Sequence, residues 1–470
     1  MNTADSTSFM HHEFAHDSIA DLGYDWSRIG DPGIAAKPPF KVYLPRDAAD
    51  AARAVAESRA LGETLTVRGS GHSSNNLVLA PGGSVLVTRQ MNRILAIDHA
   101  TPSVTVEAGA SLIEVDRALA PEGLGLPVVG DHRHITVGGF ASVGGVSPAS
   151  HRYGLFVDNV RAIDYVDERG DIARCGPHSD PDRFRRLLTG CGRHGVIVGL
   201  ELAALRVDKR AQWLVNTGRA FRDVDDFIGY GEELLNDRES GRMQRGYWTD
   251  LSDGNPALRF GKWLSYQPCS GSWPQRARRG LSQRLRGAWG SRVSRLPAGL
   301  GGPARAVSGL AIMFAPPYQS LQDAETLTDV VMEYSVGDPV RWWAAWTPMP
   351  NYRSTFHRLY DLYRRYRAET GCLTAISVLT QGIRSPYLTG DDTDPAPRGA
   401  VMMICGVRPD RMTPDVLARL TGETDDICLD EGALRYLHSP TSTDPDRLAR
   451  LDPNAAANTP APRPIAEVTK

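Results

Sequence analysis

The amino-acid sequence predicts an α+β protein of two domains. A chain of 470 residues exceeds the roughly 250–300 residues at which a single hydrophobic core stops growing. Short runs with strand periodicity alternate with helical patterns over residues 37–208, which we expect to form the first domain. The second domain should span residues 209–430. It combines an amphipathic helical pattern at 353–367 with apolar runs, typical of buried strands, at 375–379 and 400–407.

The composition excludes several classes of partner. Hydrophobic residues make up 41% of the chain and charged residues 23%, which is typical of a soluble globular protein. The net charge of −2 gives no bulk attraction to nucleic acid or to an anionic membrane, so neither is expected as a partner. The six cysteines are scattered without a Cys-x-x-Cys pair, so no zinc or other metal site is expected. Because the sequence shows no secretory signal and no apolar run long enough to span a bilayer, we expect a cytoplasmic protein.

Three segments differ in composition from the two expected domains. Residues 1–36 are polar and irregular, and we expect a partly ordered arm. Residues 454–470 are rich in Ala and Pro, and we expect a disordered tail. Residues 275–306 hold many arginines, which admits a nucleic-acid or membrane patch as one interpretation. A solvated insertion is the favoured interpretation, because Gly and Pro interrupt any continuous amphipathic face.

The first domain begins with a strand, a helix and a second strand. Residues 41–45 have strand character and end at a proline. Either Asp47 or Asp50 could cap the Ala-rich helix expected at 51–61, and residues 65–67 form the next strand. This is not a Rossmann unit, because no Gly-x-Gly-x-x-Gly opens the helix.

The remaining elements of the first domain follow from the same patterns. Residues 159–175 predict a hairpin, and the long apolar strand that begins at Val196 closes the domain. The full set of further expected elements is strands at 84–88, 94–98, 103–108, 159–166, 171–175 and 196–207, and helices at 112–119 and 182–188.

A glycine-rich segment at residues 68–76 is the first candidate site. It reads Arg-Gly-Ser-Gly-His-Ser-Ser-Asn-Asn, and its small residues bring successive backbone N–H groups together as in an anion-binding nest. A surface turn carrying a solvated His72 is the alternative for this segment alone. However, two further glycine-rich segments follow, at 136–145 and 190–197.

The three segments, in this order, resemble the FAD-binding domain of the vanillyl-alcohol oxidase and p-cresol methylhydroxylase (PCMH) superfamily. The cytokinin dehydrogenase branch is the most similar, followed by berberine-bridge-enzyme-like oxidases. The resemblance implies a two-subdomain PCMH-type FAD-binding domain over 37–208. It also implies a substrate-binding cap domain, with an antiparallel sheet and flanking helices, over 209–430. Residues 431–453 would then return to the FAD-binding domain.

The resemblance also implies how FAD is held. His72 falls on the position at which the cytokinin dehydrogenase branch carries the flavin covalently, through its 8α-methyl group. A noncovalent flavin beside a neutral histidine is the alternative. A second, cysteinyl link is excluded, since His134 stands where the bicovalent relatives have cysteine. The residues that the resemblance assigns to FAD are Arg68, Gly69, Ser70, Gly71, His72, Ser73, Asn76, Thr136, Gly138, Gly139, Ser142, Gly145, Gly195, Ile197 and Tyr436.

Asp131 is the candidate catalytic residue. It precedes Thr136-Val137-Gly138-Gly139 by the distance at which cytokinin dehydrogenases carry an aspartate that acts as a base toward the substrate's amine hydrogen. His132, Arg133 and His134 are possible neighbours that would orient the carboxylate. The alternative is a loop aspartate that caps a turn.

These residues together predict an FAD-dependent oxidase or dehydrogenase. It would remove a hydride from a C–N or C–O bond of a small-molecule substrate and pass the electrons to oxygen or another acceptor. A place in bacterial specialised metabolism is expected. The alternative from a different class is a flavin-bound cyclase or binding scaffold without net redox turnover.

Overall fold

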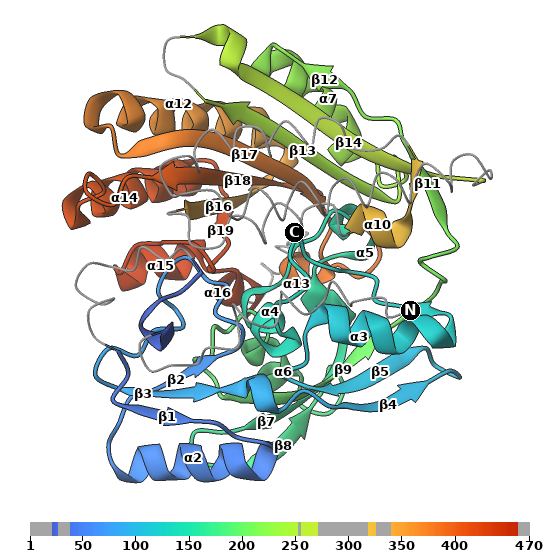
Figure 1. The fold of residues 1–470 in the computed structure, drawn as a ribbon, viewed down its shortest axis with the longest axis vertical. Helices are drawn as coiled ribbons and strands as arrows, with labels where there is room; N and C mark the ends of the chain where they lie inside the picture. Colours follow the sequence, from blue (N-terminus) through green and yellow to red (C-terminus); the bar gives the residue numbers. More distant parts are fainter. Residues whose placement is uncertain (1–20, 27–37, 252–254, 271–317, 326–339, 459–470) are drawn as a thin grey trace, which may run out of the picture.

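A computed structural model describes residues 21–26, 38–251, 255–270, 318–325 and 340–458 of the chain. Over these residues the fold mixes helices with parallel and antiparallel sheets, which confirms the α+β class. We call residues 38–206 the N-terminal part, which lies at the bottom of Figure 1, and residues 213–451 the C-terminal part, most of which lies above it. The arginine-rich stretch at 275–306 lies outside the described residues. None of the described helices is long and apolar enough to cross a membrane.

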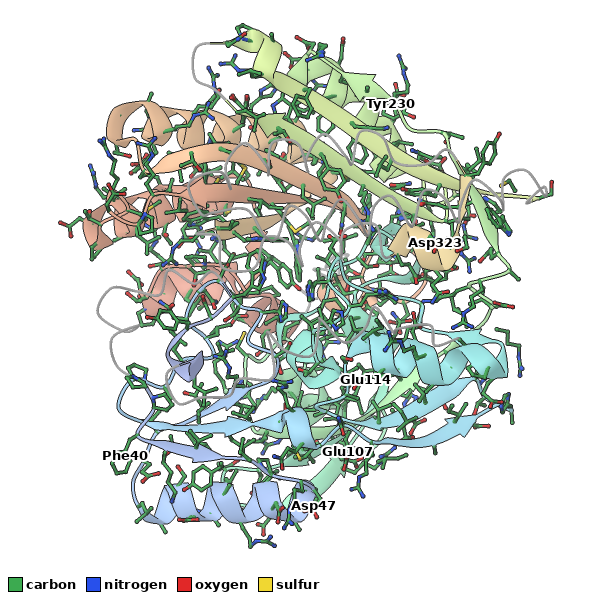
Figure 2. All side chains as sticks on the ribbon, in the orientation of Figure 1. Phe40, Asp47, Glu107, Glu114, Tyr230 and Asp323 are labelled. Carbon is green, nitrogen blue, oxygen red and sulfur yellow. The ribbon has the colours of Figure 1, made fainter. Side chains whose placement is uncertain are left out.

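The N-terminal part opens with a small parallel sheet in the order β1-β3-β2. Asp47, labelled in Figure 2, caps the following helix by accepting a hydrogen bond from the Asp50 N–H at 2.8 Å. Ala51 and Val55 of that helix are buried against both this sheet and the next one. The elements are β1 (Lys41–Tyr43), α2 (Ala48–Ala60), β2 (Leu65–Arg68) and β3 (Ser84–Val87).

A five-stranded antiparallel sheet in the order β4-β5-β9-β7-β8 completes the N-terminal part. Ser111 and Glu114 form a capping box that starts α3, and Thr136 caps α4. The elements are β4 (Ile94–Asp98), β5 (Ser103–Glu107), α3 (Leu112–Leu119), β6 (Leu124–Gly125), α4 (Val137–Val143), α5 (Ser150–Tyr153), β7 (Val160–Val166), β8 (Ile172–Cys175), α6 (Pro181–Leu187), β9 (Val196–Ala203) and β10 (Leu205–Arg206).

The C-terminal part is built on one large sheet in the order β15-β11-β14-β13-β17-β18-β16-β19, and β12 also pairs with β14. All its strand pairs are antiparallel. The strands are β11 (Trp213–Asn216), β12 (Ala220–Phe221), β13 (Met243–Asp250), β14 (Arg259–Cys269), β15 (Tyr318–Ser320), β16 (Val340–Pro348), β17 (Leu373–Ile383), β18 (Arg398–Val407) and β19 (Leu434–Arg435). The helices are α7 (Val224–Asn236), α10 (Leu321–Glu325), α12 (Tyr352–Thr370), α13 (Pro386–Thr389), α14 (Pro414–Asp430), α15 (Pro445–Leu451) and α16 (Pro453–Asn458).

The two faces of the large sheet pack against different partners. Side chains alternate along β16, so Trp343 belongs to the core shared with helices α7, α12 and α14. Trp342 and Trp346, on the other face, belong to the core shared with the N-terminal part. In Figure 1 the helices α12 and α14 accordingly lie on the outer side of the sheet. The inner face of the sheet is therefore positioned to close any site that the N-terminal part presents.

The expectation of a disordered tail from residue 454 onward is wrong for its first residues. The chain continues as α16, and Asn454 is buried. Its side-chain amide donates to the Leu188 carbonyl at 2.7 Å, and Asp452 forms an ion pair with Arg193 at 2.6 Å. These polar contacts across the sequence hold the segment in place, and composition alone does not reveal them. Residues 459–470 lie outside the described residues.

Candidate active site

A cavity of about 190 Å³ lies between the N-terminal part and the inner face of the large sheet. Its wall brings together the three glycine-rich segments, the loop that carries Asp131 and strands β16 and β18. The expected site residues that line it are Gly69, Ser70, Gly71, His72, Ser73, Asp131, Thr136, Gly138, Gly139, Ser142, Gly195, Ile197 and Tyr436.

The first glycine-rich segment forms a tight loop directly after β2. A Cβ at Gly69 would overlap with the Thr136 hydroxyl, and Gly71 has a φ of +77°, so both positions need glycine. Among the hydrogen bonds of the described residues, none has the backbone N–H of Ser70 or Gly71 as its donor. The Ser73 Oγ is buried at the cavity and has no hydrogen-bond partner within the described part of the chain. A loop with such donors fits an anionic group such as a diphosphate.

His72 stands in this loop as a neutral imidazole. Burial, followed by the nearby charges of His134 and Arg68, lowers the pKa of His72 to about 3. The Nδ1 atom lies 3.1 Å from the Ser70 Oγ. Its ring is 4.2 Å from that of His132, whose pKa burial also lowers well below the ordinary value. An imidazole in this state keeps a lone pair available for bonding at neutral pH.

The second glycine-rich segment forms the start of α4 and brings backbone to the cavity. The Gly138 N–H donates to the Ala108 carbonyl at 2.9 Å, and a Cβ on Gly138 would lie 2.8 Å from the Ala108 Cβ. The Ser142 Oγ donates to the Gly138 carbonyl at 2.7 Å. The third segment is anchored on the same helix, because the Cys191 N–H donates to the Ser142 carbonyl at 2.8 Å.

Asp131 lies on the loop between β6 and α4, at the boundary with the large sheet. The Gln381 Nε2 of β17 donates to its Oδ2 at 2.8 Å. The Arg245 Nη1 of β13 lies 3.2 Å from its Oδ1, and this arginine side chain is only 1% exposed. Both oxygens of a cavity-lining carboxylate are therefore held by the C-terminal part. His132, Arg133 and His134, which the sequence offers as neighbours, do not provide these two contacts.

Three expected cofactor residues do not line the cavity. The Arg68 guanidinium donates to the Tyr24 carbonyl at 2.9 Å and packs against Gly71. The Asn76 N–H donates to the Asp25 carboxylate at 3.1 Å, and Gly145 lies against the Phe156 side chain. All three contact other parts of the protein and are not among the residues that line the cavity.

Sequence reasoning missed an aromatic side of the cavity. Trp342 and Met402 come from β16 and β18, and Trp26 comes from the arm. Trp342 lies 5.6 Å from the His438 ring, which lies 4.1 Å from that of Tyr436. Burial lowers the pKa of His438 to about 3, so this side carries no histidine charge at neutral pH. A tryptophan in a strand usually indicates a core, and only the register of the sheet identifies those that face a cavity.

Several buried polar atoms on this side have no hydrogen-bond partner among the described residues. The Nε1 atoms of Trp26 and Trp342 and the Nδ1 atom of His438 are buried, with no hydrogen-bond partner within the described ranges. Buried polar atoms are rarely left without partners in a native protein, so these atoms fit a ligand that carries hydrogen-bonding groups. Within the described residues, no group of three or more His, Cys, Asp or Glu is arranged to hold a metal ion.

The sequence was also compared with those of known proteins and families. Residues 39–176 match the family described as FAD binding domain. The chain is 38% identical over 227 residues to an uncharacterized oxidoreductase in the fasciation locus of Rhodococcoides fascians, a match that covers 48% of this chain and 50% of the relative. It is 31% identical over 233 residues to cytokinin dehydrogenase 6 of Oryza sativa subsp. japonica, covering 48% of this chain and 43% of the relative. Cytokinin dehydrogenase 3 of Arabidopsis thaliana is 31% identical over 211 residues, covering 43% and 40%.

These matches span half or less of the relatives' own length. The match to the FAD binding domain family, over residues 39–176, includes the first two glycine-rich segments that line the cavity. The resemblance inferred from those segments is thereby confirmed: the chain carries an FAD binding domain and is similar in sequence to cytokinin dehydrogenases.

Proposed function

We propose that the chain is an FAD-dependent oxidase or dehydrogenase that removes a hydride from a C–N or C–O bond of a small molecule. The observation that carries this proposal is the position of Asp131. Its carboxylate faces the same cavity as the glycine-rich loops of the FAD binding domain. A proton acceptor and a redox cofactor would thus meet the substrate in one place.

The glycine-rich loops and His72 would hold the cofactor. The donors of residues 70–73 suit its diphosphate, and the close approaches of Gly69 to Thr136 and of Gly138 to Ala108 hold the segments that line the cavity. We propose that His72 carries the flavin covalently, because a buried neutral imidazole is the form that can bond to carbon. When bound, FAD supplies the acceptor for the substrate's hydride and returns the electrons to oxygen or to another acceptor.

The residues of the chain have separable tasks in this reaction. Asp131 takes the proton from the substrate N–H or O–H as the adjacent C–H bond breaks, which is general base catalysis. The aromatic side made by Trp342, Tyr436 and His438 provides flat apolar surface for a planar substrate, and its polar atoms offer hydrogen bonds. Because the large sheet covers the cavity, it would also limit access of water to the reacting atoms.

The relatives suggest where to look for the substrate. Two of them are named cytokinin dehydrogenases, so a secondary amine of that kind is the first candidate for this chain, and alcohols and sugars follow. The cavity carries a carboxylate paired with an arginine and neutral histidines, which agrees with a substrate of low net charge.

The experiment is an anaerobic screen for loss of visible flavin absorbance. The purified holoprotein is mixed with cytokinins, benzylic secondary amines, benzylic alcohols and sugars. Bleaching by at least one compound, with recovery of colour in air or with an added acceptor dye, is the expected result. A protein that binds FAD but is reduced by no member of the panel would favour the flavin-bound cyclase or scaffold instead.

A further inference from the structure

Asp131 makes two contacts with the large sheet that its proposed role as a base does not by itself require. Its two carboxylate oxygens are held by Arg245 at 3.2 Å and by Gln381 at 2.8 Å. Both partners are buried, with exposures of 1% and 0% respectively.

The pairing of β13 and β17 explains why these two side chains converge. Gly246 is paired with Thr380 in this antiparallel ladder. One residue further along each strand, Arg245 and Gln381 stand opposite each other and point to the same face of the sheet. That face is the inner one, because Leu379 of the same strand packs in the core shared with the N-terminal part. The two donors thus form a rigid pair aimed at the loop of Asp131.

Of the two side chains that hold Asp131, Arg245 is the one that carries a charge. The Oη atom of Tyr247 in β13 lies 3.3 Å from the Arg245 Nη1, and the charge of Asp131 acts on both Tyr247 and Tyr436. Burial raises the pKa of both tyrosines, so both stay neutral through the working pH range. His132, the next residue along the loop, is neutral as well. Arg245 therefore supplies positive charge that balances the carboxylate at this buried position.

We propose that Arg245 is a positioning residue, which together with Gln381 orients the Asp131 carboxylate toward the substrate proton. The inference rests on the proposed function, in which Asp131 is the proton acceptor. The two contacts fix the carboxylate of a residue that lines the cavity, which holds it toward the space that the substrate would occupy. Because Asp131 belongs to the N-terminal part and its partners to the C-terminal part, the base is assembled only where the two parts meet.

A charged partner and a neutral partner should leave different signatures. A guanidinium beside a carboxylate both balances its charge and fixes its orientation, whereas an amide mainly fixes its orientation. In Arg245→Met the maximal rate of flavin reduction should fall by up to about 100-fold, because the base is no longer held in line, while the substrate concentration at half-maximal rate should change little. Gln381→Leu should slow reduction less, because the charged partner stays in place.

The experiment compares Arg245→Met, Arg245→Lys, Gln381→Leu and the control Arg367→Met. Arg367 is another buried arginine paired with a buried aspartate, Asp250, at 2.8 Å, and it does not line the cavity. Each holoprotein is reduced anaerobically, over a range of substrate concentrations, by the panel compound that bleaches the wild type fastest. Arg245→Lys should restore much of the maximal rate because it keeps the charge, and Arg367→Met should lower thermal stability without slowing reduction.

Repeating Arg245→Met in an Asp131→Asn background separates positioning from general damage. If Arg245 acts through Asp131, Arg245→Met should not lower the residual rate of the Asp131→Asn variant any further. It should also cost less thermal stability in that variant than in the wild type. Thermal melts and flavin content give the stability part of this readout without any substrate, and Arg245→Gln replaces the Met variant if that variant does not fold. An unchanged maximal rate in Arg245→Met, or full additivity of the two changes, would overturn the proposal. If Asp131→Asn itself left reduction unchanged, the proposed function would fail instead.

Discussion

His72 and His132 both line the cavity, and their ring centroids lie 4.2 Å apart. Burial disfavours the charged form of both rings, and each charge would repel the other. The pair is therefore neutral at physiological pH, although one ring lies in the first glycine-rich loop and the other beside Asp131. Neutral imidazole at this place is what the covalent attachment of a flavin requires.

The first prediction concerns that attachment. Denaturing the purified protein in acid should leave the yellow colour with the polypeptide, and the intact mass should exceed that of the chain by one FAD. His72→Ala should release its flavin on denaturation while the folded variant still binds some FAD. His99→Ala is the control, since His99 is exposed and pairs with Glu122 away from the cavity. Flavin that washes freely off the wild type would show that the link is noncovalent.

The second prediction concerns stability at acid pH. His438, and His72 in protein that carries no flavin, have pKa values of about 3 in the folded protein, against about 6.5 when unfolded. Between these values the unfolded chain binds more protons, so the free energy of unfolding rises with pH and is lost as the pH falls. Each histidine contributes at most about 1.4 kcal/mol per pH unit to this slope. Urea unfolding from pH 7 to 4 measures it, and His438→Asn should flatten it. An equal slope in the variant would contradict the assignment.

The third prediction concerns the close approach of the first loop to Thr136. Gly69→Ala should lower the FAD content of the purified protein, because its Cβ would overlap with the Thr136 hydroxyl and force the loop to move. Gly422→Ala in α14 is the matched control, since a Cβ there meets open space. It should keep full FAD content and raise the free energy of unfolding by about 0.5–1 kcal/mol through helix propensity. Full FAD content in both variants would show that the loop tolerates displacement.

The sequence could predict elements whose signals are local. The Ala-rich pattern before Leu61 predicts α2, and Asp47 was one of the two caps expected. The tyrosine and leucine stripe that includes Phe356 predicts the buried face of α12. The glycine-rich segments predict residues of the cavity wall, because segments that pack closely need glycine whatever the rest of the fold.

The contacts that complete the site depend on register and could not be read in this way. Gln381 reaches Asp131 across 250 positions of the chain. Only the pairing of β13 with β17 puts it opposite Arg245. Trp342 and Trp343 are adjacent and equally apolar, yet one lines the cavity and the other joins the core beneath the helices. A shift of one residue in strand register would exchange them.

The most direct measurement is the rate of anaerobic flavin reduction by substrate in wild type and Asp131→Asn. The asparagine keeps the shape of the side chain but cannot accept a proton. Flavin content and spectrum should be preserved, the rate should fall by about 10²–10⁴-fold, and the acid limb of the wild-type pH profile should disappear. Unchanged reduction kinetics in Asp131→Asn would contradict the account, and loss of flavin together with activity would reduce Asp131 to a structural residue of its loop.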